Sequence, residues 1–283
     1  MGSPHSAQSH RLALGISAGM LGLFVVAACL GPAAGGSPAG AVPSRTLTVF
    51  AAASLTEPFA ELGRQFEATH PGVRVQFNFA GTQQLRAQLE QGAHADVFAA
   101  ASAKEMDAAI AASLAVNGTQ RTFARNRLVV IVPSGNPGKV RSPADLGRPG
   151  LKLDLADPSV PVGQYSLAML DKMSRDPAYG ADFARKVESN VVSREDNVKS
   201  VVQKVSLGEV DAGVVYATDV GGAAARVGEV PVPDQYNQIA AYPIAPRARA
   251  PQPVLAQQFT EMVTSTVGQK VLAGHGFLPA GGE

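Results

Sequence analysis

The 283-residue sequence has few features that could cross-link the chain or give it a strong charge. It contains one cysteine, Cys29, and no tryptophan, and its 24 Lys and Arg nearly balance its 23 Asp and Glu. A single cysteine excludes an internal disulfide, so the folded part depends on its hydrophobic core. The near-neutral charge and the lack of a basic block argue against nucleic acid as a partner, and against an electrostatic hold on membranes.

The first 44 residues carry targeting signals rather than a fold. Residues 1–28 contain an apolar run, Ile16 to Ala28, which is typical of a secretory signal peptide and too short for a membrane span. The run ends in VAAC, which resembles the lipobox of bacterial lipoproteins and implies lipidation of Cys29. A plain signal peptide followed by a free thiol is the alternative. Residues 29–44 are rich in Gly, Pro and Ala, so we expect a lipidated flexible tether there.

The rest of the chain alternates apolar strand-like runs with amphipathic helical stretches. This alternation predicts an α/β fold with mainly parallel sheets, and 46% apolar composition is enough for two modest lobes. The expected strands are 47–51, 73–79, 97–100, 128–132, 151–156 and 212–216, with two more in 230–245. The expected helices are 55–70, 82–91, 104–112, 164–174, 177–187 and 196–207, with one closing helix over 253–273.

Short turns of small or polar residues join several of these strands to helices. Such turns lie at Ser54, at Gly81-Thr82, at Pro161 to Gly163, and at Asn197-Val198. Because the carboxyl ends of strands in open α/β sheets face the ligand crevice, four helix N-termini with free N–H groups could converge on an anion. At Ser54 alone, the simpler reading is a helix cap.

Four phrases in the sequence carry a family resemblance. TVFAAASLTEPF, FNFAGTQQLRAQLEQGAHADVFAAAS, DPSVPVGQY and DAGVVYATD occur in the order found in the periplasmic molybdate-binding proteins of ABC importers, which the chain resembles over nearly its whole mature length. The resemblance implies a two-lobed periplasmic binding protein of type II, with a mixed, mainly parallel sheet flanked by helices in each lobe. It places 45–131 plus 225–283 in lobe 1 and 132–224 in lobe 2.

The resemblance also implies an oxyanion site between the lobes. The family's two hydroxyl positions near the start align with Ser54 and Thr82, its two backbone N–H donors with Val162 and Val198, and its tyrosine hydroxyl with Tyr216. Thr82 replaces the usual serine, so its extra methyl changes the pocket wall. Neutral hydroxyls and amides at helix N-termini can hold a dianion without Lys or Arg.

The resemblance implies a binding protein and not an enzyme. We expect it to be a monomer, lipid-anchored at the outer face of the cytoplasmic membrane, that captures molybdate or tungstate and delivers it to an ABC permease. No cofactor and no direct cation ligands are expected, since the metal is bound as its oxyanion and the histidines are isolated. A receptor for sulfate or another tetrahedral oxyanion is the alternative.

A secreted α/β hydrolase is a more distant alternative. The phrase GISAG, residues 15–19, matches the pattern of a hydrolase nucleophile, but it lies inside the signal peptide and has no strand before it. No histidine lies near a candidate nucleophile. The sequence therefore favours a binding protein over an enzyme.

Overall fold

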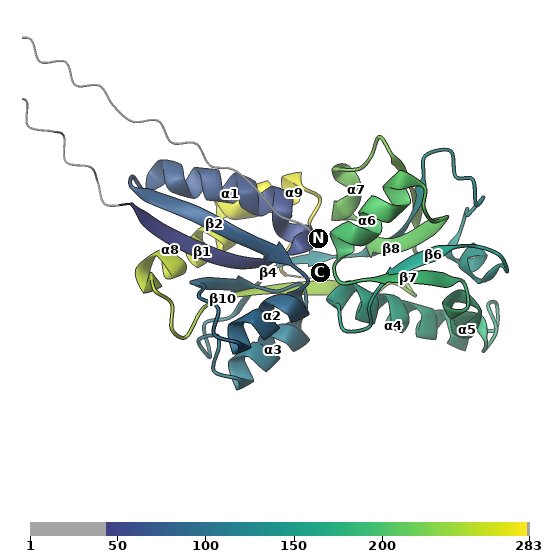
Figure 1. The fold of residues 1–283 in the computed structure, drawn as a ribbon, viewed down its shortest axis with the longest axis horizontal. Coiled ribbons are helices and arrows are strands. Elements are labelled where there is room, and N and C mark those ends of the chain that lie inside the picture. The colour runs from purple at the N-terminus through teal and green to yellow at the C-terminus, as the bar shows by residue number, and fades with distance from the viewer. Residues whose placement is uncertain (1–43, 282–283) are drawn as a thin grey trace, which may run out of the picture. The chain divides into compact units, whose positions relative to one another are not determined.

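The structure is a computed structural model that describes residues 44–281. The signal peptide 1–28, the lipidation of Cys29 and all but the last residue of the tether 29–44 lie outside the described residues and stay predictions. Within the described part, no helix has both the length and the apolar character needed to cross a membrane. The described residues form one compact unit, which holds two separate sheets (Figure 1).

The first sheet has the strand order β2-β1-β3-β10-β4. Its strands are β1 Arg45–Ala52, β2 Val73–Ala80, β3 Val97–Ala99, β4 Arg121–Asn126 and β10 Ala240–Pro246. β1 pairs in parallel with β2 and β3, whereas β10 runs antiparallel to β3 and β4. The carboxyl end of β1 therefore lies at the same edge as those of β2 and β3, beside the start of β10.

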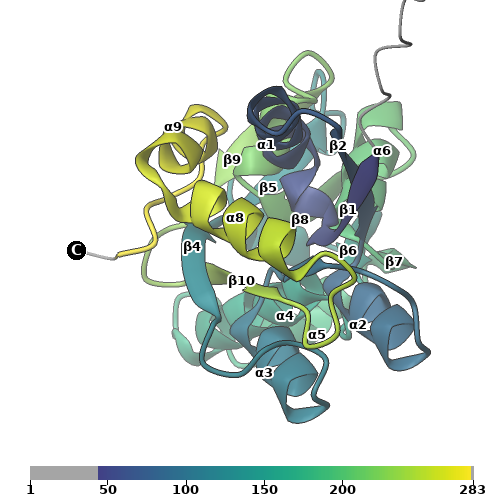
Figure 2. The same cartoon turned by 90° about the vertical axis from the view of Figure 1, so that its left-hand side faces the viewer.

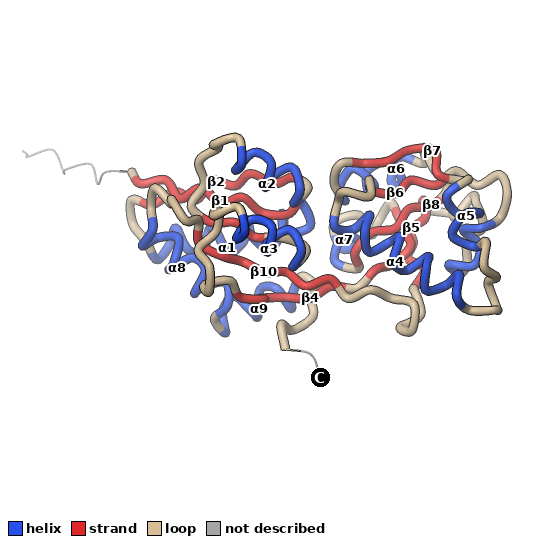
Figure 3. Tube along the Cα trace, turned by 90° about the horizontal axis from the view of Figure 1, so that it is seen from below, coloured by secondary structure: helices blue, strands red, loops and turns tan. Residues whose placement is uncertain are grey.

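The second sheet repeats this plan with the order β7-β6-β8-β5-β9 (Figure 3). Its strands are β5 Leu128–Pro133, β6 Leu153–Ala156, β7 Val191–Glu195, β8 Ala212–Tyr216 and β9 Val227–Pro231. β6 pairs in parallel with β7 and β8, and β5 pairs antiparallel with β8 and β9. Two mixed sheets are confirmed, although parallel pairings do not outnumber antiparallel ones in either sheet.

Helices cover both faces of each sheet. Those of the first sheet are α1 Thr56–Thr69, α2 Thr82–Glu90, α3 Ala103–Ala111, α8 Pro253–Thr264 and α9 Thr266–Gly274. Those of the second are α4 Pro161–Arg175, α5 Phe183–Glu188, α6 Val198–Leu207 and α7 Thr218–Gly221. Figure 2 shows α1 and α9 on one side of the first sheet and α2 and α3 on the other. Phe59 packs between Phe123 and Phe259, at ring distances of 5.7 and 5.9 Å, in the core under α1.

Two short segments cross from one sheet to the other, between β4 and β5 and between β9 and β10. Asn237 in the second crossing binds the first residue of β5, because its side chain accepts from the Leu128 N–H at 2.9 Å and donates to the Leu128 carbonyl at 2.8 Å. The lobe boundaries expected at 131/132 and 224/225 differ from the boundaries of the two sheets. All of β5 and β9 belong to the second sheet, which spans Leu128 to Pro231, because β5 pairs with β8 on one side and with β9 on the other.

Several element predictions were also wrong in detail. β4 and β7 were not predicted, and the helix expected over 177–187 is confined to α5, since Gly180 has a left-handed backbone with φ of 83°. The single closing helix is two helices, because Ser265 ends α8 and its hydroxyl caps α9 by accepting from the Gly268 N–H at 3.3 Å. Two short 3₁₀ turns, Ala53–Leu55 and Pro143–Gly147, complete the elements.

Candidate functional site

The five predicted site residues line one cavity between the two sheets. The space free of protein atoms there is about 220 Å³, with adjoining open solvent included. Its wall is formed by Ala52, Ala53, Ser54, Ala80, Gly81, Thr82, Ala101, Val160, Pro161, Val162, Asn197, Val198 and Tyr216. None of these residues is charged, so any anion bound there would meet only hydroxyls, amides and small apolar groups.

Ser54 lies in the 3₁₀ turn that separates β1 from α1. The small residues of this turn bring the chain directly from the strand end to the cavity, and Ser54 is only 3% exposed. The reading of Ser54 as a helix cap was wrong, because Leu55 occupies the N-cap position of α1 and makes no side-chain cap bond. The Ser54 hydroxyl instead lies 3.0 Å from the Tyr242 hydroxyl.

Tyr242 is a functional candidate that the sequence did not reveal. It lies on β10, is fully buried, and also approaches the Asn126 amide nitrogen at 3.5 Å. An amide nitrogen can only donate, so the Tyr242 proton remains available for the Ser54 oxygen. With that oxygen accepting from Tyr242, the Ser54 proton is free to point into the cavity.

Thr82 is the first residue of α2 and is 1% exposed. Its hydroxyl oxygen accepts from the Ala101 N–H at 3.1 Å, which leaves its proton for a ligand. Gly81 precedes it, and a side chain there would meet the Asp196 carbonyl oxygen, because the added Cβ would lie 2.3 Å from it. Glycine is therefore required at this position by the close approach of the two halves of the molecule.

Val162 and Val198 contribute backbone groups from the other side of the cavity. Val162 follows Pro161 in the first turn of α4, and Val198 is the first residue of α6. N–H groups in the first turn of a helix have no intrahelical partner and carry the positive end of the helix dipole. The Asn197 side chain caps α6 by accepting from the Ser200 N–H at 3.1 Å, so it does not occupy the Val198 N–H.

Tyr216 closes the cavity at the end of β8. It is 1% exposed, and its hydroxyl has no hydrogen-bond partner among the described residues. Burial raises the pKa of this phenol well above its usual value, so it stays protonated. An unpaired buried hydroxyl is costly, and an anion in the cavity would supply the missing acceptor.

Polar contacts join the two halves around the cavity. Lys199 on α6 binds Glu57 on α1 at 2.9 Å and the buried Asp219 at 3.2 Å. Burial acts to lower the pKa of Lys199, but the two carboxylates outweigh it and raise the pKa. Asp196 accepts from Gln84 at 2.8 Å. The carboxylates of Glu195 and Asp196 do not line the cavity.

The family model for bacterial extracellular solute-binding proteins matches residues 47–278. The chain belongs to this family. Proteins of this family bind solutes outside the cytoplasm and are not enzymes, so the hydrolase alternative is excluded. The molybdate-binding protein ModA of Mycobacterium tuberculosis is 41% identical over 268 residues, which cover 93% of this chain and 98% of that protein.

Two solved structures share the fold. The sulfate-binding protein SubI of Mycobacterium tuberculosis aligns with a TM-score of 0.75 at 20% identity, over 83% of this chain and 86% of that one. The periplasmic molybdate-binding protein of Azotobacter vinelandii aligns with a TM-score of 0.69 at 20% identity, over 82% of this chain and 98% of that one. The two bind different anions, so the fold alone does not select between molybdate and sulfate.

Proposed function

We propose that this protein captures molybdate in the cavity between its two sheets. The observation that carries the proposal is the convergence of Ser54, Thr82, Val162, Val198 and Tyr216 on one uncharged cavity. The similarity to the ModA of Mycobacterium tuberculosis favours molybdate over sulfate as the ligand.

The binding chemistry is that of a dianion held by neutral donors. Ser54, Thr82 and Tyr216 each offer a hydroxyl proton, and Val162 and Val198 offer N–H groups at helix starts. Each charge-assisted hydrogen bond contributes about 1.5–3 kcal/mol, so several in a closed cavity replace the hydration of the anion. The dipoles of α4 and α6 add positive potential without a counter-ion that would have to be desolvated.

The same arrangement gives a basis for rejecting phosphate. The oxygens of Ser54 and Thr82 are engaged by Tyr242 and the Ala101 N–H, so the hydroxyls act toward a ligand as donors. Phosphate at neutral pH carries at least one proton and needs an acceptor for it. Fully deprotonated molybdate, tungstate and sulfate have no such need, and cavity size then separates the larger anions from sulfate.

The proposed place of action is the outer face of the cytoplasmic membrane. After removal of residues 1–28, acylated Cys29 and the tether 29–44 would hold the protein there as a monomer. An ABC permease would take up the molybdate, or tungstate, when the two halves open. The contacts between Lys199 and Glu57, and between Asp196 and Gln84, support a closed form that must separate for release.

A thermal-shift titration of residues 42–283 tests the proposal, because a ligand that binds only the native state raises the melting temperature. Molybdate, tungstate, sulfate and phosphate are compared at equal concentration. We expect molybdate and tungstate to stabilise the protein selectively. Equal stabilisation by sulfate would favour the sulfate receptor instead, and no shift with any anion would refute the site.

A further inference from the structure

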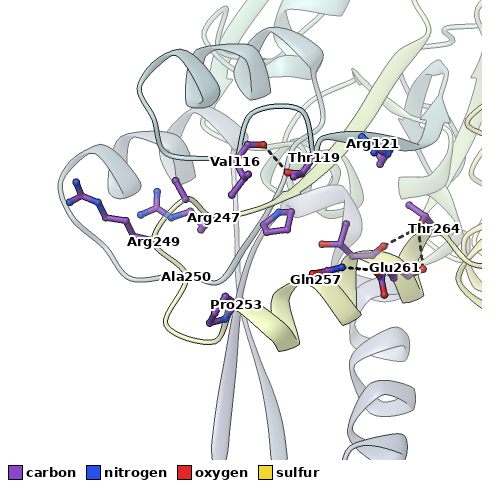
Figure 4. A pocket seen from close by; sticks show the side chains of 13 residues that line it. Val116, Thr119, Arg121, Arg247, Arg249, Ala250, Pro253, Gln257, Glu261 and Thr264 are labelled. Carbon is purple, nitrogen blue, oxygen red and sulfur yellow. Dashed lines mark hydrogen bonds between the residues drawn. The ribbon is translucent and has the colours of Figure 1, made fainter.

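A second, larger cavity lies within the first lobe. It has a volume of about 1270 Å³, open space included. It lies between the loop after β10, the start of β4 and one side of α8 (Figure 4). Arg247 and Arg249 lie on its loop side, and Gln257 and Glu261 on its helix side (Figure 4). Apolar residues fill much of the remaining wall, namely Val116, Pro246, Ala248, Ala250 and Pro253.

This cavity lies at the end of the first sheet remote from the candidate molybdate site. Arg247 donates its N–H to the Asp96 carbonyl at 2.8 Å, and Asp96 in turn donates to the Thr48 carbonyl at 2.8 Å. Arg247 is thus level with Thr48 near the start of β1, whereas Ser54 follows the end of that strand. Six residues of strand correspond to roughly 20 Å, so one small ligand cannot occupy both cavities.

The Arg247 guanidinium lacks a partner in the part of the chain that the structure describes. Its Nε and Nη1 atoms are buried and form no hydrogen bond. Burial, together with the neighbouring charge of Arg249, lowers the pKa of Arg247. A buried charged donor without an acceptor is unfavourable, and native proteins rarely keep one without a reason.

The acids near the cavity are already engaged. The Asp96 carboxylate accepts from the Thr48 N–H at 2.8 Å and from the Gln252 N–H at 2.6 Å. Glu261 accepts from Gln257 at 2.9 Å. Within the described range, no salt bridge joins Arg247 or Arg249 to an acid, so both guanidinium groups are available to an anion from outside the fold.

We infer that Arg247 and Arg249 bind the phosphate group of an organic phosphate ester, whose remaining part packs on the apolar wall of this cavity. A guanidinium can donate two parallel N–H hydrogen bonds to two phosphate oxygens, and a second arginine neutralises the second negative charge of the phosphate. The wall combines these two arginines with apolar residues, which favours an ester with an apolar or organic part over inorganic phosphate. The ester is either a soluble metabolite or the headgroup of an anionic glycerophospholipid.

The position of the cavity makes the lipid headgroup a reasonable source. β1 begins at Arg45, at the same end of the sheet as Arg247, and the expected tether immediately precedes Arg45. A lipidated tether would bring this end of the protein near a membrane surface. The near-neutral charge argues against nonspecific electrostatic binding of the protein to membranes. Specific binding of one phosphate group needs only these two arginines.

The test uses residues 42–283, which contain all described elements in one compact unit. Binding of glycerol 3-phosphate is measured by calorimetry, and binding to phosphatidylglycerol-containing or pure phosphatidylcholine vesicles by co-sedimentation. The variants are Arg247→Gln and Arg249→Gln. Arg175→Gln is the control, because Arg175 is an exposed arginine on α4 in the other lobe.

We expect Arg247→Gln to weaken binding to at least one probe by about tenfold or more, and Arg249→Gln by less. Arg175→Gln should have no effect, and all variants should keep their molybdate response, which verifies their folding. Binding to phosphatidylglycerol vesicles identifies the lipid source, whereas binding to glycerol 3-phosphate alone identifies a soluble ester. Binding to neither probe, or equal losses in Arg247→Gln and Arg175→Gln, would overturn the inference.

Discussion

The two sides of the candidate molybdate cavity use different chemistry. In the proposed site, the first sheet offers side-chain hydroxyls, Ser54 and Thr82, whereas the helices of the second would offer backbone N–H groups at Val162 and Val198. A hydroxyl is specified by residue type, but a backbone donor is specified by where a helix begins. A single side-chain substitution can therefore remove a donor on the first side. On the second side, a side-chain substitution leaves the donor in place as long as the helix still begins at the same residue.

The largest effect should come from removing a backbone donor. Val198→Pro deletes the N–H at the first position of α6, where proline fits a helix, and Asn197 before it is already extended with φ of −158° and ψ of 163°. We expect molybdate affinity to fall about 100-fold, with the melting temperature of the free protein little changed. Val198→Ala keeps the N–H and should bind nearly normally in the same calorimetric titration. Equal losses in both variants would contradict the backbone role.

Removing the Ser54 hydroxyl should be next in size. Ser54→Ala loses a donor and leaves the Tyr242 hydroxyl without its 3.0 Å partner, so we expect about 10- to 100-fold weaker molybdate binding. Tyr242→Phe tests the orientation of Ser54 and should weaken binding less, since Ser54 itself remains. A normal dissociation constant for Ser54→Ala would remove this residue from the site.

Tyr216→Phe should weaken molybdate binding about tenfold without destabilising the free protein. Its hydroxyl has no partner among the described residues, so removing it costs no internal hydrogen bond. Melting curves with and without molybdate separate these effects. Tyr165→Phe is the control, because the Tyr165 ring lies 6.5 Å from the Tyr216 ring but does not line the cavity. A fall in the melting temperature of free Tyr216→Phe would indicate a structural role instead.

Contacts across the cavity should matter less than the donors. Glu57→Gln weakens the ion pair with Lys199, which is partly exposed, so we expect a loss of only a few-fold in molybdate affinity. The loss should shrink at high salt, which screens the pair in the wild type. Glu90→Gln removes an ion pair within the first lobe and serves as the control. Molybdate affinity unchanged in Glu57→Gln at low salt would show that the pair does not favour closure.

The smallest effect on binding, but a pH-dependent effect on stability, is expected at Asp154. Burial, with the charges of Glu195 and Glu209, raises the pKa of Asp154 to about 7. Because the folded protein holds this proton more tightly than the unfolded chain, the carboxyl destabilises the fold increasingly as pH rises from 4 to 7. Asp154→Asn should thus gain a few degrees in melting temperature, relative to wild type, between pH 5 and pH 8. A difference that does not change with pH would contradict this.

Strongly patterned parts of the fold were predictable from the sequence. The helix over 55–70 and the strands near 47–51 and 212–216 have buried apolar runs or a clear helical period, and they match α1, β1 and β8 closely. β4, with the sequence RTFARN, was missed because charged residues interrupt its apolar pattern. Its strand state depends on pairing with β10, which lies far away in the sequence.

The convergence of the site residues could only be expected through the family resemblance, since five positions spread from 54 to 216 carry no local signal of proximity. Tyr242 was missed for the same reason, because its contact with Ser54 joins residues 188 positions apart. The packing role of Gly81 has no local sequence signal either, because only the folded chain shows the Asp196 carbonyl beside it. The local sequence pattern identifies where helices begin, but tertiary packing determines which other residues lie beside those helix N-termini.

Calorimetric titration of residues 42–283 with molybdate, repeated in the presence of excess sulfate, tests the central claim most directly. The account predicts saturable binding of one molybdate per chain that excess sulfate displaces only weakly, and that Val198→Pro greatly reduces. An absence of molybdate binding by the folded wild-type protein would contradict it.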